Sequence, residues 1–392
     1  MATAGERSDP KGVNGVRVGV RVKVRLKWNG IKYTPEIQSA VDELMGVDNF
    51  KMPFASEHVE ITLNDVDVSV ANALRRTLID EMSGYCLSFD ISDFKNDIHT
   101  DLFMDPEFIR LRVRCMKTMR HMPKELLKNL KFAINVHNKT DEVMIIYAKD
   151  LLLTNGKLES AIFNPTYELA FVQPGRSLTI QNIRFDFGKG VYNATFNNAC
   201  RAACMPLDIE EYPREDIYSA EGSQRVLSGF KISTLVANPR KFLIKFDMPA
   251  VLDNGGKTTY LTIMDACMNI MSRLQYIQRS IEESQNSHQT VDTITFIRTD
   301  VVVDGVTMKK FVVNIKNETD TIGGLLARTI CNLNPDISCC FYSCIDHEKV
   351  MSLNIRNEVT DPLELETMVI DAIKQNIATF TSIKKDVQAL IS

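Results

Sequence analysis

The feature that most restricts the fold of this sequence is an internal repeat. When the chain is shifted by 252 positions, the segment Ile61–Leu78 aligns with the segment Val313–Ile330. Apolar residues fall on apolar residues in both segments, and Arg76 falls on Arg328. Alternating apolar residues followed by a helical pattern are typical of a strand that leads into a helix. The sequence therefore predicts two copies of one strand-and-helix unit in a single polypeptide.

Both copies carry a helix-start signal at the same place. Hydroxyl residues stand at equivalent positions, Ser69 and Thr321, and we expect them to be the N-caps of the two helices. Apolar residues then recur at every fourth position, as one buried helical face requires. The alternative is a chance match between two short amphipathic helices that lie in ordinary cores.

Each copy is followed by a longer amphipathic helix, with apolar stripes at Leu261–Ile281 and Ile370–Leu390. A small sheet with helices on one face leaves much apolar helix surface uncovered. Two such units can cover each other by packing their helices together. We therefore expect a dimerisation seam made of apolar residues from both copies: Val70, Leu74, Leu78, Leu274, Ile322, Leu326, Ile330, Ile373, Ile377 and Phe380.

The expected fold class is α+β, with two sheet-plus-helix domains packed as a pseudo-dimer. Short strands and turn signals between Met119 and Gln224 indicate a β-rich insertion in the first domain, and Gln285–Thr290 is the best linker. The C-terminal part is expected to run strand, strand, helix, strand, helix. The expected boundaries are an N-terminal extension at 1–56, a first domain at 57–118 and 228–284, the insertion at 119–227, a linker at 285–291 and a second domain at 292–392.

The N-terminal region contains a basic strand. Residues Val16–Leu26 alternate, so that Arg17, Arg21, Lys23 and Arg25 share one face. A solvated edge strand is one interpretation, and a nucleic-acid contact is the other. The second interpretation is the basis of an alternative function, a free-standing nucleic-acid-binding protein.

Composition restricts the possible partners. The formal net charge is −4, whereas a protein that grips nucleic acid over a large area usually carries a basic balance. No apolar run is long enough to span a bilayer, so we expect no membrane contact. The nine cysteines are an odd number without a close Cys-x-x-Cys pair, and we expect reduced thiols.

No set of residues predicts catalysis or a bound metal. Cys339, Cys340, Cys344 and His347 have zinc-like spacing, but neighbours on a strand face opposite sides and cannot both bind one ion. The histidines are scattered, and no acid cluster of the kind that holds catalytic magnesium is evident. We therefore expect no catalytic residue, no metal and no cofactor.

Residues 72–81 resemble the signature helix of the alpha-subunit family of RNA polymerases. That family includes the bacterial alpha N-terminal domain and the third-largest subunit of eukaryotic RNA polymerase II. Residues 107–112 resemble the segment that follows the helix in this family. Two further stretches, 146–151 and 172–178, resemble parts of the family's inserted domain.

The second copy resembles the smaller partner in the same family, the eleventh subunit of RNA polymerase II. The resemblance is carried by residues 317–326, by 334–338 and by His347. One chain with both subunits is similar to the fused subunit of large DNA viruses of the African swine fever virus type, which residues 101–104 and 163–168 also resemble.

The resemblance implies a non-catalytic assembly scaffold for a viral DNA-directed RNA polymerase. The implied partners are the two largest polymerase subunits and a small zinc-binding subunit, with DNA and RNA contacted only through the complex. Arg75 and Arg76 lie where alpha-like subunits meet the large subunits, so they are the expected partner-binding residues. The implied location is the host cytoplasm and the virion, with the nucleus as the alternative.

Overall fold

The structure is a computed structural model of the chain. It describes residues 21–28, 54–96, 105–116, 118, 123–156, 162–197, 201–207, 209–213, 231–235, 239–251, 257–287, 293–303, 306–335, 337, 339–345, 349–357 and 362–390. The predicted short helix at Pro35–Leu44 and residue His347 lie outside these ranges.

The first half of the chain forms a four-stranded antiparallel sheet in the order β1-β2-β13-β10. Its strands are β1 (Arg21–Trp28), β2 (Phe54–Asn64), β10 (Arg201–Pro206) and β13 (Phe242–Val251). Along β2, Val59, Ile61 and Leu63 are buried while the residues between them are partly exposed. This period of two places one face of the sheet in the core. The basic N-terminal segment is therefore an edge strand over its described residues, 21–26.

The second half forms another four-stranded antiparallel sheet, in the order β14-β15-β17-β16. Its strands are β14 (Ile294–Val303), β15 (Val306–Lys316), β16 (Cys339–Ile345) and β17 (Val350–Asn357). Sequence analysis expected one strand between the two helices of this half, and the structure has two. The sequence pattern does not separate these two strands, because β16 and β17 form a hairpin whose turn contains no glycine or proline.

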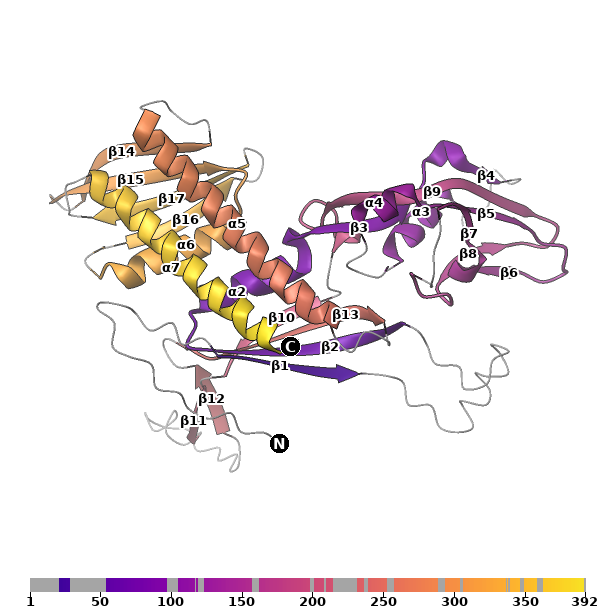
Figure 1. Cartoon of the computed structure of the whole chain (residues 1–392), viewed down its shortest axis with the longest axis horizontal. Helices are drawn as coiled ribbons and strands as arrows, with labels where there is room; N and C mark the ends of the chain where they lie inside the picture. The colour runs from indigo at the N-terminus through magenta and orange to yellow at the C-terminus, as the bar shows by residue number, and fades with distance from the viewer. Residues whose placement is uncertain are drawn as a thin grey trace, which may run out of the picture.

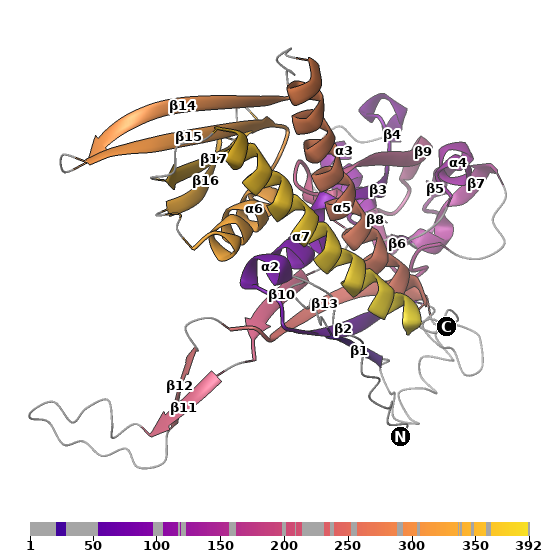
Figure 2. The ribbon, with the colours of Figure 1, turned by 60° about the vertical axis from the view of Figure 1, so that its left-hand side comes forward.

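Helices lie on one side of each sheet. They are α2 (Val68–Arg76), which continues into the π-helical turn η1 (Thr77–Glu81), α5 (Lys257–Ser287), α6 (Asp320–Leu333) and α7 (Pro362–Ala389). The two long helices, α5 and α7, run side by side between the sheets, and α2 packs on α6 (Figures 1 and 2). In addition, α7 reaches β1 of the first sheet while α5 reaches β14 of the second.

The two halves share one order of elements. The first reads β1, β2, α2, β10, β13, α5, apart from inserted elements, and the second reads β14, β15, α6, β16, β17, α7. The strand orders in the two sheets correspond position by position. One continuous hydrophobic core contains residues from both sheets and all four helices. The α+β fold class predicted from the sequence is confirmed.

The first half carries inserted elements with a hydrophobic core of their own. A five-stranded sheet contains β3 (Ser83–Ser88), β4 (Phe94–Asn96), β5 (Lys131–His137), β7 (Leu152–Asn155) and β9 (Ser177–Lys189). A separate pair is made by β6 (Met144–Tyr147) and β8 (Glu168–Val172). The helical elements are α3 (Pro106–Cys115), α4 (Lys124–Asn129) and the 3₁₀ turns η2 (Ile91–Asp93), η4 (Ala148–Asp150) and η5 (Ala194–Phe196).

Some residues pack or pair with elements on the other side of the expected domain boundaries. Leu87, Ile109 and Val113 precede the expected insertion at 119–227, yet they belong to its core. Strand β10 falls within the expected insertion, yet it pairs with β13 of the first sheet. The boundaries at 56/57, 118/119 and 227/228 remain predictions.

A second hairpin extends from the first half. Strands β11 (Ile209–Pro213) and β12 (Lys231–Leu235) pair only with each other among the described strands. In Figure 2 this hairpin projects away from the two sheets and the helices.

Three details differ from the sequence-based expectation. Helix α2 is capped by Asp67, whose side chain accepts a hydrogen bond from the Ser69 backbone nitrogen, so Ser69 is not the cap. Helix α6 has Thr319 at its N-cap, so Thr321 lies inside the first turn. Helix α5 includes residues 285–287, which had been assigned to the linker. Each of the three helices extends two or three residues past its expected boundary, since local sequence patterns define helix ends less sharply than helix interiors.

We expect the shared core to be sensitive to loss of Leu326. This side chain is fully buried in α6, so Leu326→Ala should lower the free energy of unfolding by about 2–5 kcal/mol through lost burial and a residual cavity. Leu333 on the same helix is 37% exposed, and Leu333→Ala should cost less than about 0.5 kcal/mol. Urea unfolding of the two variants makes the comparison, and equal effects would contradict the assignment of α6 to the core.

Candidate functional site: the junction of the two halves

Helices α2 and α6 are joined by two reciprocal arginine contacts. Arg76 at the end of α2 donates from Nε to the Thr321 hydroxyl at 3.0 Å, and its Nη2 lies 3.5 Å from the Asp320 carboxylate. Arg328 on α6 donates from Nε to the Asp67 carboxylate at 3.1 Å, at the start of α2. Arg76 and Arg328 are equivalent in the repeat, so each helix reaches the N-terminus of the other. Such two-way contacts are the mark of an isologous interface.

Asp67 caps its own helix, α2, and also binds an arginine of the second half. Its carboxylate accepts from the Ser69 backbone at 2.9 Å and from Arg328 of the second half. Burial opposes the ionisation of Asp67, but the hydrogen bonds from Ser69 and Arg328 and the charge of Arg328 outweigh burial, and its pKa lies below the ordinary value. The ionised carboxylate also suits the positive end of the α2 dipole.

A buried ionic cluster lies behind these contacts. Glu81, at the end of η1, is only 2% exposed. Arg273 of α5 donates from Nη1 to Glu81 Oε2 at 2.5 Å and from Nη2 to Glu318 Oε2 at 2.5 Å. The Thr319 hydroxyl donates to Glu81 Oε1 at 3.1 Å and accepts from Arg273 at 2.9 Å. The Thr321 hydroxyl also donates to Glu81. We call Glu81, Arg273, Glu318, Thr319 and Thr321 the junction cluster.

The junction cluster joins three separate parts of the chain. Glu81 and Arg273 belong to the first half, while Glu318 and the two threonines belong to the second. Burial opposes the ionisation of Glu81, but Arg273 and the threonine hydroxyls outweigh burial and place its pKa below the ordinary value. Burial likewise disfavours charge on Arg273, and the two carboxylates raise its pKa. Both groups therefore stay charged at neutral pH.

The two arginines predicted to bind partners have different surroundings. Arg76 is engaged in the junction between the halves, which sequence analysis did not foresee. Arg75 is half-exposed on the other side of α2 and donates from Nε to Asn72 Oδ1 at 2.9 Å. Partner binding by either residue remains a prediction.

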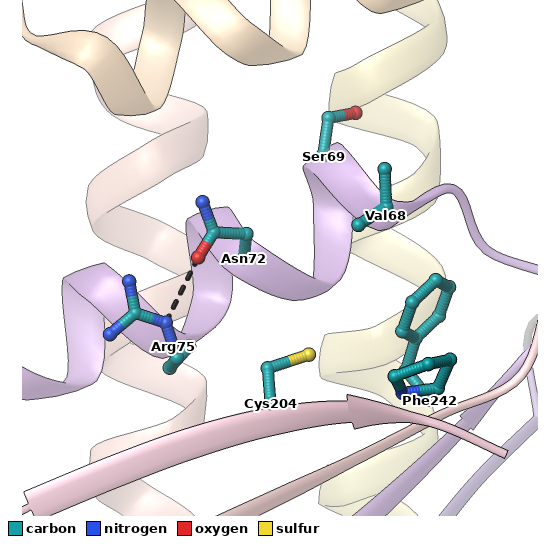
Figure 3. A pocket seen from close by; sticks show the side chains of 7 residues that line it. Val68, Ser69, Asn72, Arg75, Cys204 and Phe242 are labelled. Atoms are coloured by element: carbon teal, nitrogen blue, oxygen red, sulfur yellow. Dashed lines mark hydrogen bonds between the residues drawn. The ribbon is translucent and has the colours of Figure 1, made fainter. Parts of the chain in front are cut away.

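Arg75 borders a cavity of about 250 Å³ between α2 and β10. Figure 3 shows Asn72 and Arg75 on the helix above Cys204 of the strand, with Phe242 beside them. Val68 at the start of α2 completes this side and is 47% exposed. The cavity is open to solvent and lies on the surface of the first half.

The predicted seam residues lie together. Nine of them are buried in the core that both halves share, and Ile377 is partly buried against it. They come from α2, η1, α5, α6 and α7. Their role in dimerisation remains a prediction, although the structure brings them together.

Sequence analysis missed Arg273 and Glu318. The available signal for Arg273 was weak, since a charged residue beside an apolar helical stripe is ordinarily solvated. Its partners Glu81 and Glu318 are 192 and 45 positions away. No local pattern identifies such a contact.

The described part of the chain offers no group of three or more His, Cys, Asp or Glu residues placed to hold a metal ion. Cys339 and Cys340 are adjacent on β16, and His347 is outside the described residues. The expectation of no zinc therefore remains a prediction. No described helix is long and apolar enough to cross a membrane.

Fold and junction together define a protein made of two copies of one α+β unit, joined in one chain and linked by reciprocal contacts. Over 360 residues, 91% of the chain, the sequence is 32% identical to proteins called DNA-directed RNA polymerase RPB3-11 homolog, of which 95% is covered. These come from the Pretoriuskop tick isolate and the Vero-adapted Badajoz strain of African swine fever virus, and a Kenyan pig isolate has a relative at 31% identity. The chain belongs to this family of RPB3-11 homologues, as its resemblance predicted. No family model matches it.

The pH dependence of stability should reveal the charge of Glu81. Because the pKa of Glu81 is depressed, its ionised form stabilises the fold above the ordinary value of 4.5, and this contribution is lost as the pH falls through the folded-state pKa. Glu81→Gln should cost about 3–5 kcal/mol at neutral pH by breaking a buried pair. The difference from the unmodified protein should shrink in acid.

Glu282→Gln on the exposed side of α5 is the matched control, because its amide can still accept from Gln278. Chemical denaturation across the acid range measures both variants. A Glu81→Gln penalty that does not change between neutral and acid pH would show that the charge is not what stabilises the junction.

Proposed function

We propose that this chain is a non-catalytic assembly subunit of a viral DNA-directed RNA polymerase. The observation that carries the proposal is the match to RPB3-11 homologues, because it extends over both halves of the chain. The described residues support a scaffold: two four-stranded sheets and their helices enclose one shared core, and charged residues such as Arg273 and Glu81 join the two halves. Catalysis belongs to other subunits in this proposal.

The two halves act as an intramolecular alpha-like heterodimer in this proposal. Three observations support it: the equal order of elements, the reciprocal contacts of Arg76 and Arg328, and the packing of α5 along α7. Fusing the halves fixes their ratio at one to one and raises their effective concentration.

The proposed partners are the two largest polymerase subunits and a small zinc-binding subunit, with nucleic acid contacted through the complex. Arg75 is the proposed contact, because it is half-exposed and borders an open cavity. The proposed location is the host cytoplasm and the virion, and the nucleus is the alternative. Fractionation of infected cells and purified virions checks the location.

Separate expression tests the heterodimer. The fragments 1–290 and 291–392 should co-purify at one to one, because each exposes an apolar helix face that the other covers. Size-exclusion chromatography with light scattering measures this. Two fragments that are each soluble and monomeric and do not associate would rule out the heterodimer.

Single arginine variants test the partner surface. Arg75→Ala should leave the melting temperature nearly unchanged but weaken capture of the two largest subunits by roughly 30-fold or more, the equivalent of losing about 2 kcal/mol of interface energy. Arg76→Ala should instead lower stability by on the order of 1–3 kcal/mol, because charged hydrogen bonds across the junction are lost.

Arg279→Ala is the control, an exposed arginine on α5 that should change neither property. Thermal melting and quantitative pull-down of co-expressed subunits give the two readouts. If Arg75→Ala assembles as well as the unmodified chain, Arg75 is a solvated charge. A salt-sensitive gel shift by the isolated chain, without any capture, would favour the nucleic-acid-binding alternative.

A further inference from the structure

A second cavity lies beside the junction cluster. Its volume is about 450 Å³, and one of its walls is a face of helix α5. This wall presents four side chains that share one side of the helix, because they stand three or four positions apart: Asp265, Met268, Asn269 and Ser272. Met268 is 39% exposed, so this side of α5 is open to a partner.

The opposite wall comes from the segment that leaves η1 and enters β3. It consists of Met82, Ser83 and Tyr85. The ring of Tyr85 packs edge-on against Phe185 of β9, with 5.7 Å between the ring centroids. This wall is therefore attached to the core of the inserted elements. We call the space between the two walls the α5–β3 cavity.

The α5–β3 cavity lies directly beside the ion pair that joins its two walls. Met82 follows Glu81 in the chain, and Ser272 precedes Arg273. Glu81 and Arg273 are the central pair of the junction cluster. An occupant of the cavity would therefore contact the same two parts of the chain that this pair holds together.

Asn269 brings a polar atom without a partner to the α5–β3 cavity. Its side-chain oxygen, Oδ1, is buried and accepts no hydrogen bond. The Ser272 hydroxyl does not supply the donor, because it donates to the backbone oxygen of Asn269 at 2.9 Å. Most buried acceptors in folded proteins have a partner, and leaving one without a donor is costly. An occupant that supplies a donor would satisfy this oxygen.

The charge of the lining is complementary to a cation. Asp265 contributes a carboxylate one helical turn from Asn269, and no lysine, arginine or histidine is among the described residues that line the cavity. The several N–H donors of a basic side chain can serve two acceptors at this spacing, and a charged donor forms the stronger hydrogen bond. Met82 and Met268 place flexible apolar groups beside these oxygens, which suits the alkyl stem of a basic residue.

We propose that the α5–β3 cavity is a docking site for a basic side chain, lysine or arginine, of another polymerase subunit. The inference rests on the proposed function and adds a contact separate from Arg75, which borders the other cavity. The cation pairs with Asp265, donates to Asn269 Oδ1 and lays its stem on the two methionines. Because the cavity lies between β3 and α5, its occupant also holds the inserted elements against the junction.

Asn269→Leu separates a partner contact from a structural one. The change removes the unpartnered oxygen and keeps a side chain of similar size, so the melting temperature of the free chain should stay the same or rise. The variant is co-expressed with the other subunits of its polymerase, and each captured subunit is quantified by pull-down. Capture of the subunit that docks here should weaken by about tenfold or more, because a charged donor loses its acceptor.

Asn332→Leu is the matched control, since this exposed asparagine lies on α6 and does not line the cavity. It should change neither the melting temperature nor the capture of any subunit. An Asn269→Leu variant that melts earlier than the unmodified chain would show that Asn269 is a structural residue, which overturns the proposal.

The charge of the occupant is tested at Asp265. Asp265→Asn keeps the shape of the side chain and removes its charge, so capture should weaken and should depend less on salt, because salt screens accessible ion pairs. Asp265→Glu keeps the charge and should retain most of the capture. If both variants lose capture equally and keep the salt dependence of the unmodified chain, the occupant is not a cation and the proposal is wrong.

Occupancy is measured with a thiol at the rim. Met268→Cys places the thiol at an exposed position, where iodoacetamide should alkylate it in the free chain and less in the complex. Mass spectrometry locates the product, and the neighbouring Cys267 should not react, because burial raises its pKa to about 12. Protection already present in the free chain would mean that a segment of this chain fills the cavity. That result, or equal reactivity in the complex, overturns the proposal.

The outcomes separate this inference from the proposed function. If Asn269→Leu assembles as well as the unmodified chain, the cavity holds only water, the inference fails and the scaffold function stands. If the unmodified chain captures no polymerase subunit, the scaffold function fails, and the inference fails with it.

Discussion

The structure depends on the mutual covering of two apolar helical surfaces. Each half has a four-stranded sheet with helices on one side, and neither can bury all its apolar helix surface alone. Helices α5 and α7 pack along each other, and each also reaches the sheet of the other half. The result is one continuous core instead of two, and folding of either half is thereby linked to the presence of the other.

Hydrophobic burial alone does not choose one arrangement of two similar helix pairs, because apolar contacts have little directionality. The hydrogen bonds and ion pairs of the junction cluster are directional, and they select one arrangement of the two halves. A shift of the halves by one helical turn would separate Arg273 from Glu318 and Glu81 from the hydroxyls of Thr319 and Thr321, and a buried charge that loses its partners is costly. Arg76 and Arg328 add the same restriction on the two sides of the α2–α6 contact. Buried polar contacts thus specify the geometry, and the apolar core supplies most of the stability.

The two halves keep one topology but differ on the surfaces that do not face each other. The first half carries the insertion, the projecting hairpin and an open cleft beside Arg75. In the second half, at the corresponding place between α6 and β16, the ring of Tyr342 packs on Gly323. The surfaces that the two halves bury against each other must keep their apolar residues. The other surfaces of each half can change without loss of the shared core. Differences between the halves are therefore the better guide to function.

The sequence by itself determined the class of the fold and the existence of two equivalent units. Strand and helix periodicities are local, so the pattern around Ile61 and Val313 sufficed, and the resemblance of residues 72–81 correctly indicated the family. Local signals did not determine the helix caps, the second strand of the β16–β17 hairpin or the different surroundings of Arg75 and Arg76. Only the tertiary structure brought Glu81, Arg273 and Glu318 together. The partner of a buried charge is set by how distant helices pack, and no pattern within a few residues contains that information.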